Sequence, residues 1–253
     1  MKMLVKFGLL FFMAPLYMFW EARRNRLIKE KVTIKDLPPT FEGKNLLFIS
    51  DIHKRQLPQR FVNEWKNDVS LIIVGGDLAE KGVPEERVRK NLRLLKQAGE
   101  VLFVWGNNDM EERTMITRLL EEEDIISLEN DSYQWKIKGD SVGIVGLGNK
   151  YGRLDSRVAG IQGDECCRIA VVHDPAAFRS IKEKGNISFG LAGHTHGGQI
   201  RIGSFGIGEK GGWKKVGNMP VLISNGYGTT AVPLRLGAPS QVHLLTLSAS
   251  EES

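Results

Sequence analysis

Five short apolar segments of this 253-residue chain are each followed by residues whose side chains can bind metal ions. The segments are NLLFIS, LIIVGG, VLFVWG, RIAVV and ISFGLAG, and the residues that follow them are Asp51, His53, Asp77, Asn107, His173, His194 and His196. Four of the five histidines of the chain lie at these positions. Imidazole, carboxylate and amide ligands without thiolates suit Mn²⁺, Fe or Zn²⁺ in a catalytic site better than a structural zinc site. Seven ligands are too many for one tetrahedral ion and suit two ions that share a carboxylate.

The local sequence around these residues can aim their side chains at one point. In an extended Asp-x-His segment, the side chains of Asp51 and His53 lie on the same side of the chain. Glycines around His194 and His196, in LAGHTHGGQI, disfavour a helix and permit a tight loop. Each residue taken singly has a structural alternative, such as a helix cap for Asp77. Those alternatives do not explain why the histidines cluster after apolar segments.

The elements that carry these residues can be predicted from the same segments. Fully apolar runs of this length are typical of strands that are buried on both faces. Helices are predicted over residues 58–68, 84–100, 112–124 and 175–185, and the alternation favours a mostly parallel sheet with a functional crevice at its carboxyl edge. SYQWKIK, SVGIVGLG, MPVLISNG and QVHLLTL predict a second, more antiparallel sheet. The predicted fold class is α/β, a four-layer α/β/β/α sandwich of two mixed sheets flanked by helices.

The N-terminus, MKMLVKFGLLFFMAPLYMFWEARRNR, predicts a membrane-anchor helix. Residues 3–20 contain only one charge, Lys6, and are about long enough to span a bilayer. A cleaved signal peptide and an interfacial or buried helix are the alternatives. The basic cluster follows the apolar stretch, so a single span would leave the main domain in the cytoplasm. We therefore predict an anchor with a basic flank over residues 1–31 and the main domain over 32–253, with 32–43 as a linker or edge segment.

Charge and cysteine content exclude some other classes of protein. The chain has a formal net charge of +5, but residues 1–31 hold seven basic and two acidic residues, so the remainder is neutral. A basic groove for nucleic acid has no support, and no nucleic-acid partner is expected. Cys166 and Cys167 are adjacent and indicate no disulfide framework. The sequence contains no P-loop, dinucleotide-binding fingerprint or Ser-His-Asp signature.

The motifs and their order resemble the calcineurin-like metallophosphoesterase family. They are D-x-H at 51–53, G-D at 76–77, G-N-x-D at 106–109, a single histidine at 173 and G-H-x-H at 193–196. The resemblance covers residues 44–247, and HTHGGQIRI and NGYGTTAVPLRLGAPSQVHLLTL are similar to the membrane-anchored bacterial branch of that family.

This resemblance implies two divalent metal ions, for which we favour Mn²⁺ over Fe or Zn²⁺. It implies that Asp51, His53 and His196 hold one ion, that Asn107, His173 and His194 hold the other, and that Asp77 bridges them. Such a pair would bind a bridging hydroxide for in-line attack on phosphorus.

One position departs from the family pattern. The family usually has G-N-H-D or G-N-H-E, whose histidine contacts the phosphate and can protonate the leaving group, whereas this chain has Asn108. An amide can donate a hydrogen bond but cannot transfer a proton near neutral pH. We predict Asp77 and Asn108 as the catalytic residues, with weakened catalysis for poor leaving groups. Asp109 and His243 are the alternative proton donors, although His243 alternates with apolar residues and also suits a structural role.

Two arginines are candidates for binding the phosphate of a substrate. Arg55 follows the D-x-H motif, and Arg153 lies in the segment NKYGRLD. Either guanidinium could hold a phosphate by paired hydrogen bonds. A solvated surface position is the alternative for both.

The predicted function is metal-dependent hydrolysis of phosphoester or pyrophosphate bonds, of the phosphodiesterase type. The expected substrate is a phosphorylated small molecule or a lipid-linked compound. The alternative function is a catalytically weakened, metal-binding pseudoenzyme that binds phosphorylated ligands or partners, and Asn108 is the support for it. A nuclease on the same scaffold is disfavoured by the neutral charge of the main domain.

Overall fold

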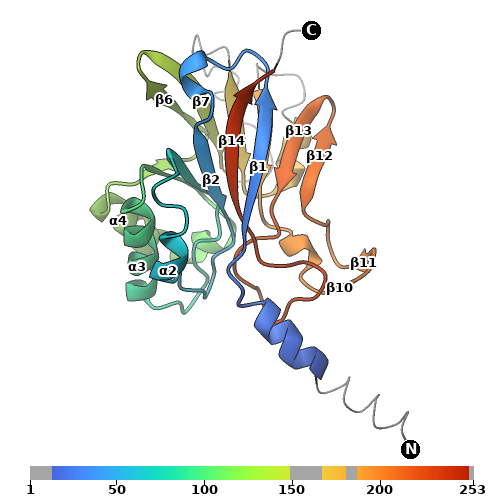
Figure 1. The fold of residues 1–253 in the computed structure, drawn as a ribbon. Coiled ribbons are helices and arrows are strands. Elements are labelled where there is room, and N and C mark those ends of the chain that lie inside the picture. Colours follow the sequence, from blue (N-terminus) through green and yellow to red (C-terminus); the bar gives the residue numbers. More distant parts are fainter. Residues whose placement is uncertain (1–12, 149–166, 181–186, 251–253) are drawn as a thin grey trace, which may run out of the picture.

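The computed structural model describes residues 13–148, 167–180 and 187–250, and two six-stranded sheets dominate it (Figure 1). The first sheet has the strand order β1-β14-β2-β3-β4-β5, and the second has the order β12-β13-β9-β8-β7-β6. Both sheets are mixed, because antiparallel pairs such as β14 with β2 and β6 with β7 adjoin parallel pairs. The predicted α/β fold with two mixed sheets and helices is confirmed.

The elements have the following bounds. The first sheet comprises β1 (Leu27–Ile34), β14 (Val242–Ala249), β2 (Asn45–Ile49), β3 (Leu71–Val74), β4 (Val101–Val104) and β5 (Ile126–Leu128). The second comprises β12 (Gly212–Val216), β13 (Met219–Ile223), β9 (Ile187–Ala192), β8 (Arg168–Val172), β7 (Asp140–Leu147) and β6 (Asp131–Ile137), and β10 (Arg201–Ile202) pairs with β11 (Phe205–Gly206). Within the described residues an N-terminal helix covers residues 13–21, and it is followed by the α-helices α2 (Gln59–Val62), α3 (Glu85–Lys96) and α4 (Arg113–Glu122). The 3-10 helices there are η1 (Pro39–Phe41), η2 (Asn108–Glu112), η4 (Pro175–Ser180) and η5 (His196–Gly198).

The central strands are apolar throughout because both of their faces are covered. On β2, Leu47 and Ile49 pack in the cluster formed with helices α2, α3 and α4, whereas Leu46 and Phe48 pack in the cluster between the two sheets. Successive side chains of a strand point to opposite faces, which accounts for this alternation. The strands β3 and β4 divide their side chains in the same way, so the core holds the first sheet rigidly between two layers.

Helices α2, α3 and α4 gather on the outer face of the first sheet (Figure 1). Helix α3 follows Pro84 and buries Val88, Leu92 and Leu95, as its apolar spacing predicts. Helix α2 is only one turn long, instead of the helix predicted over residues 58–68, and turns follow it. On the outer face of the second sheet, η4 replaces the start of the helix predicted over 175–185, and residues 181–186 lie outside the described residues.

The strands are distributed between the sheets differently from the prediction. β8 and β9 belong to the second sheet, where β7, β8, β9 and β13 pair in parallel. β14, predicted in that sheet, lies in the first sheet between β1 and β2. The apolar pattern identifies buried strands but carries no information about which of two packed sheets a strand joins.

The predicted membrane anchor is wrong for the described part of the chain. The N-terminal helix there covers residues 13–21, which reaches about 14 Å at 1.5 Å per residue. Among the described residues, no helix has the length and apolar content needed to cross a bilayer. The cytoplasmic orientation inferred from such a span therefore loses its basis. Residues 1–12 lie outside the described residues.

The predicted boundary between residues 31 and 32 runs through a strand. β1 pairs in parallel with β14 along its whole length, from Leu27 opposite Val242 to Ile34 opposite Ala249. Residues 27–31, predicted as part of a basic flank, are therefore part of the first sheet. Glu21, at the end of the preceding helix, is buried and forms ion pairs with Arg24 and Arg26 at 3.3 and 2.9 Å.

Candidate metal centre

Loops from both sheets bring the seven predicted ligand residues together. The loops after β2, β3 and β4 carry Asp51, His53, Asp77 and Asn107, and the loops after β8 and β9 carry His173, His194 and His196. The amide N–H of His194 donates to the two Asp51 carboxylate oxygens at 3.1 and 3.2 Å, which ties the second sheet to the first. The site therefore lies where two sheets meet, rather than at the edge of one parallel sheet.

One half of the site consists of Asp51, His53 and His196. The Nε2 atoms of His53 and His196 lie 3.1 Å apart, and Nε2 of His196 lies 3.4 Å from Oδ1 of Asp51. All three side chains are buried. Their ligand atoms lie within 4.8 Å of one another, which is close enough to surround one cation.

The other half surrounds His173. Its Nε2 atom lies 3.3 Å from Oδ2 of Asp77 and 3.3 Å from Nδ1 of His194. The His194 Nδ1 atom also lies 2.9 Å from Oδ1 of Asn107. Oδ2 of Asp77 is 3.7 Å from Nε2 of His53, so this carboxylate stands between the two halves. Ligand atoms of Asp51, Asp77 and His173 also form a group within 4.8 Å, which places Asp51 near both halves.

These contacts fit divalent cations. Two pairs of imidazole nitrogens, His53 with His196 and His173 with His194, approach within 3.3 Å at the centre of the site. A neutral imidazole has one unprotonated nitrogen, which is the form that binds a metal. The two carboxylates supply the negative charge that a cation requires, and nitrogen with oxygen ligands suits first-row divalent metals.

The backbone of the site is strained. Asp51, His53, Asp77, His194 and His196 all have positive φ angles, between 50° and 68°. This left-handed conformation costs an L-residue with a Cβ atom about 1–2 kcal/mol. The extended Asp-x-His segment that we predicted is therefore absent, since Asp51 and His53 have φ values of 54° and 51°. Both side chains still reach the site, because the turns between them redirect the chain.

Glycines precede several of these residues because no side chain would fit there. A Cβ atom on Gly106 would lie 2.2 Å from the backbone nitrogen and from Oδ1 of Asp77. A Cβ atom on Gly193 would lie 2.5 Å from Oδ2 of Asp51 and from the hydroxyl oxygen of Ser50. The glycines of the G-N and G-H motifs thus allow the loops to approach the carboxylates closely.

Outer residues orient the candidate ligands. Nδ1 of His173 lies 2.9 Å from the carbonyl oxygen of Gly75, which suits an Nδ1–H donor and leaves Nε2 facing the site. The buried carboxylate of Asp109 accepts hydrogen bonds from the backbone N–H groups of Asp77 and Gly106, both at 2.8 Å. Nδ1 of His53 lies 3.0 Å from Oε2 of Glu80. Such carboxylate and carbonyl partners are typical of histidines that bind metals.

Burial and mutual charge shift the protonation of these groups. Burial lowers the pKa of His196 to about 4, so this ring is neutral at neutral pH. Burial opposes the charged form of His173, but the hydrogen bond and charge of Asp77 outweigh it and raise the pKa to about 9. Burial and the charge of Asp77 raise the pKa of Asp109 to about 7. A cation bound here would have to displace the proton of His173, since metal-bound imidazole is unprotonated.

Asn108, the departure from the family pattern, contacts Asp77. Its side-chain Nδ2 donates to Oδ2 of Asp77 at 2.5 Å, and its backbone N–H donates to Oδ1 at 2.8 Å. Asn108 therefore holds both oxygens of the carboxylate that stands between the two halves of the site. Its amide is partly exposed and borders the open side of the site, with the exposed Asn107 and His194.

The other predicted residues lie elsewhere or outside the described residues. The guanidinium of Arg55 donates hydrogen bonds within the protein, to Arg23, Arg24, Asn25, Tyr227 and Ser240. It also lies 3.7 Å above the Tyr227 ring, so we propose no phosphate-binding role for it. Nδ1 of His243 lies 3.3 Å from Glu30 on the neighbouring strand, which supports its structural interpretation. Arg153 lies outside the described residues.

Arg235 is a residue of the site that the sequence analysis missed. Its guanidinium is fully buried and donates to the carbonyl oxygens of Asn225, Gly228 and Ala238 at 2.6–2.8 Å. Its Nη2 atom lies 3.2 Å from Nδ1 of His196. This arginine joins the C-terminal loop to the loop that carries His196. No pattern in a single sequence marks it, because its partners other than His196 are backbone carbonyls.

The close approach at Gly193 gives a test of the site. We expect Gly193→Ala to weaken Mn²⁺ binding by at least about tenfold, because the added methyl group must displace the Asp51 carboxylate. Gly99→Ala is the matched control, since its Cβ atom would meet only Val69 at an ordinary 3.7 Å. Calorimetric titration of both variants with Mn²⁺ measures the effect. Equal affinities in Gly193→Ala and wild type would show that the ion does not bind beside Asp51.

Comparison with known proteins identifies the family. The calcineurin-like phosphoesterase superfamily domain matches residues 45–203. The chain is 40% identical to the Bacillus subtilis protein YpbG over 86% of this chain and 85% of that protein. It is 27% identical to the B. subtilis metallophosphoesterase YkoQ, over 94% of this chain and 97% of YkoQ.

A solved structure has a similar fold. TT1561 of Thermus thermophilus superposes with a TM-score of 0.51 and 13% identity, over 73% of this chain and 90% of TT1561. The domain match includes the loops that carry Asp51, His53, Asp77, Asn107, His173, His194 and His196. The chain therefore belongs to the calcineurin-like phosphoesterase superfamily and is a metallophosphoesterase, a hydrolase that acts on ester bonds.

Proposed function

We propose that the chain is a phosphodiesterase-type hydrolase of phosphoester or pyrophosphate bonds that works with two divalent cations. The observation that carries the proposal is the position of Asp77. Its carboxylate lies 3.3 Å from His173 in one half of the site and 3.7 Å from His53 in the other. A carboxylate between two groups of imidazoles suits a bridging ligand for a pair of ions.

The described residues suit the resemblance-based assignment of ligands. Asp51, His53 and His196 would hold one ion, Asn107, His173 and His194 the other, and Asp77 both. Nitrogen and oxygen donors favour Mn²⁺ here, with Fe or Zn²⁺ as alternatives. When bound, such ions supply an activated hydroxide and offset the negative charge of the phosphoryl group.

Residues around the proposed ions hold the bridging carboxylate and the backbone of the site in place. Asn108 holds both oxygens of Asp77, and Asp109 holds the backbone on either side of the site through Asp77 and Gly106. The exposed side at Asn107 and His194 leaves room for a substrate to approach. Asn108 can donate to a phosphoryl oxygen but cannot protonate a leaving group. Substrates with good leaving groups are therefore favoured.

The proposed substrate is a phosphorylated small molecule. The lipid-linked substrate that we expected from the sequence depended on the membrane anchor, and it is not carried forward. A pyrophosphate bond and an acidic phenyl ester both release stable anions, so they require little help from a general acid.

The function is tested by metal-dependent hydrolysis. We expect the purified chain to hydrolyse bis-p-nitrophenyl phosphate with Mn²⁺, and chelation to abolish the activity. Asp77→Asn should lower kcat/KM by at least about 10²-fold, because it removes the charge shared between the two halves. Asp68→Asn, on the exposed Asp68, is the control. Activity that survives both chelation and Asp77→Asn would refute the proposed mechanism, and absence of all hydrolysis would favour a phosphate-binding protein without turnover.

The role of Asn108 has its own test. We expect Asn108→His to raise kcat/KM on alkyl phosphodiesters by about tenfold or more, because imidazole can supply the proton that the alkoxide needs. The rise should be much smaller for p-nitrophenyl esters, whose leaving group is already stable. Asn108→Gln, which keeps the amide, is the matched variant. If the histidine variant gains nothing on alkyl esters, a missing acid is not what limits the enzyme.

A further inference from the structure

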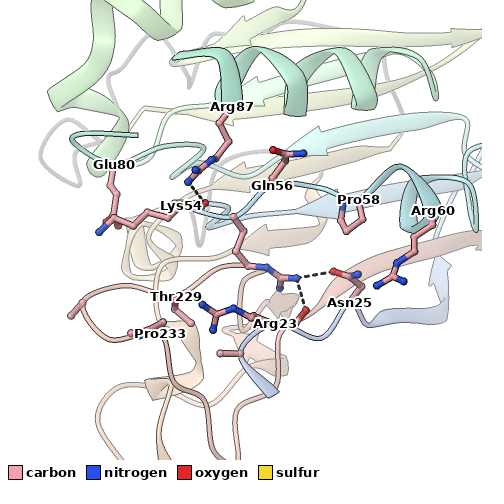
Figure 2. A pocket seen from close by; sticks show the side chains of 13 residues that line it. Arg23, Asn25, Lys54, Gln56, Pro58, Arg60, Glu80, Arg87, Thr229 and Pro233 are labelled. Carbon is pink, nitrogen blue, oxygen red and sulfur yellow. Dashed lines mark hydrogen bonds and ion pairs between the residues drawn. The ribbon is translucent and has the colours of Figure 1, made fainter. Parts of the chain in front are cut away.

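A pocket lies beside the candidate metal centre, because Glu80, one of the residues that line it, contacts His53. It has a volume of about 670 Å³ and lies between the segment after β2, which carries Lys54 and Arg60, and the residues around Arg23 and Thr229 (Figure 2). A volume of this size accommodates a nucleotide-sized ligand. The catalytic residues proposed above do not line it.

The lining of this pocket is strongly basic. Five cationic side chains line it, and one carboxylate opposes them. The cations are those of Arg23, Lys54, Arg55, Arg60 and Arg87, and the carboxylate is that of Glu80. This is an excess of four positive charges. Another pocket, of about 470 Å³, has an excess of only one positive charge, from Arg179, Lys214 and Lys215 against Asp174 and Glu209.

The basic side chains differ in how many hydrogen bonds they already form within the protein. The protein already uses the guanidinium of Arg55, because its Nη2 donates to the carbonyl oxygen of Arg23 at 2.9 Å and to Oδ1 of Asn25 at 2.7 Å. Arg87 uses one nitrogen to donate to the carbonyl oxygen of Lys54 at 2.9 Å. The exposed side chain of Arg60 has no hydrogen-bond or ion-pair partner within the described part of the chain. Arg60 and Arg87 therefore retain N–H donors for a ligand.

One pair of residues forms a wall between the pocket and the metal centre. Glu80 lies 3.0 Å from Nδ1 of His53 through one oxygen and 2.6 Å from Nζ of Lys54 through the other. The carboxylate is thus neutralised by Lys54 and turned toward a candidate metal ligand. Because Glu80 is the one carboxylate in the lining and is paired with Lys54, the described residues of the lining provide no further carboxylate for Arg60 and Arg87.

The opposite rim is held in place. Gln199 donates to the carbonyl oxygens of Thr230 and Val232 at 3.1 and 2.8 Å and accepts a hydrogen bond from the Thr230 N–H at 3.0 Å. These contacts fasten the loop that contributes Thr229 and Pro233 to the pocket. A preformed rim reduces the entropy that a ligand must lose on binding.

We propose that this pocket is an anion site for a phosphorylated group, separate from the metal centre. Guanidinium groups bind phosphate by paired, charge-assisted hydrogen bonds, and their positive charges repel one another until an anion binds. The phosphorylated group belongs either to the distal part of a substrate held at the metal centre or to a second ligand. In both cases the guanidinium groups of the pocket would bind the phosphate oxygens.

Binding of inorganic tripolyphosphate tests the proposal. The full chain is titrated by calorimetry, both loaded with Mn²⁺ and after chelation, with thermal unfolding as the check on folding. We expect the double variant Arg60→Gln with Arg87→Gln to weaken binding by at least about tenfold, because two charge-assisted contacts are lost. Added salt should weaken binding to wild type.

The matched control is Lys66→Gln with Lys90→Gln. It removes the same charge from exposed positions that follow α2 and lie on α3, outside the pocket. Equal affinity for tripolyphosphate in the two double variants, in the Mn²⁺-loaded chain, would overturn the proposal. This result does not depend on hydrolysis, so it stands even where the proposed function fails.

Kinetics distinguish the two sources of the phosphorylated group. A substrate subsite predicts that the Arg60/Arg87 double variant raises KM for a nucleoside diphosphate sugar at least about fivefold more than KM for bis-p-nitrophenyl phosphate. A site for a second ligand predicts instead that tripolyphosphate changes kcat for bis-p-nitrophenyl phosphate in wild type and not in that variant. Each pattern supports the anion site, and the absence of both patterns contradicts it.

Discussion

The site depends on holding carboxylates and imidazoles from two sheets within a few ångströms of one another. Asp51 and Asp77 are buried, and His53, His173 and His196 are buried beside them. Burial of ionised groups is unfavourable unless opposite charges or hydrogen bonds compensate it. Here the compensation is reciprocal, since the charge of Asp77 raises the pKa of His173, and His173 holds the pKa of Asp77 well below its usual range. A divalent cation between them would replace the protons in the same electrostatic role.

The rest of the fold supplies the rigidity that this arrangement requires. Five candidate ligands have left-handed backbone conformations, each of which costs about 1–2 kcal/mol. The strands that precede them are buried on both faces. β2, β3 and β4 lie between the helices and the second sheet, and β8 and β9 lie between the first sheet and η4. Close-packed strands resist movement, so the strained loops are held where the chemistry needs them. Arg235 adds to this rigidity, because its guanidinium contacts both the carbonyl oxygen and Nδ1 of His196 and so links the His196 loop to the C-terminal loop.

The buried strands and the ligand-bearing loops that follow them could be predicted from the sequence, because both depend on local sequence patterns. Apolar runs that end in Asp51, Asp77 or His173 indicated both the buried strands and the polar loops. The assignment of β8 and β9 to a second sheet could not be predicted, since it is decided by packing between distant segments. The apolar sequence of residues 3–20 indicated a membrane span, whereas the N-terminal helix among the described residues covers only residues 13–21. Arg55 appeared to be a phosphate ligand because of its position after the motif, whereas its partners come from residues 23–25 and from Tyr227 and Ser240.

The central claim is that Asp77 joins two divalent cations at the meeting point of the two sheets. Anomalous diffraction at the manganese absorption edge, from crystals grown with Mn²⁺, measures this directly. The account predicts two peaks separated by about 3.5–4 Å, with the carboxylate of Asp77 between them. A single peak, or two peaks of which neither adjoins Asp77, would contradict it.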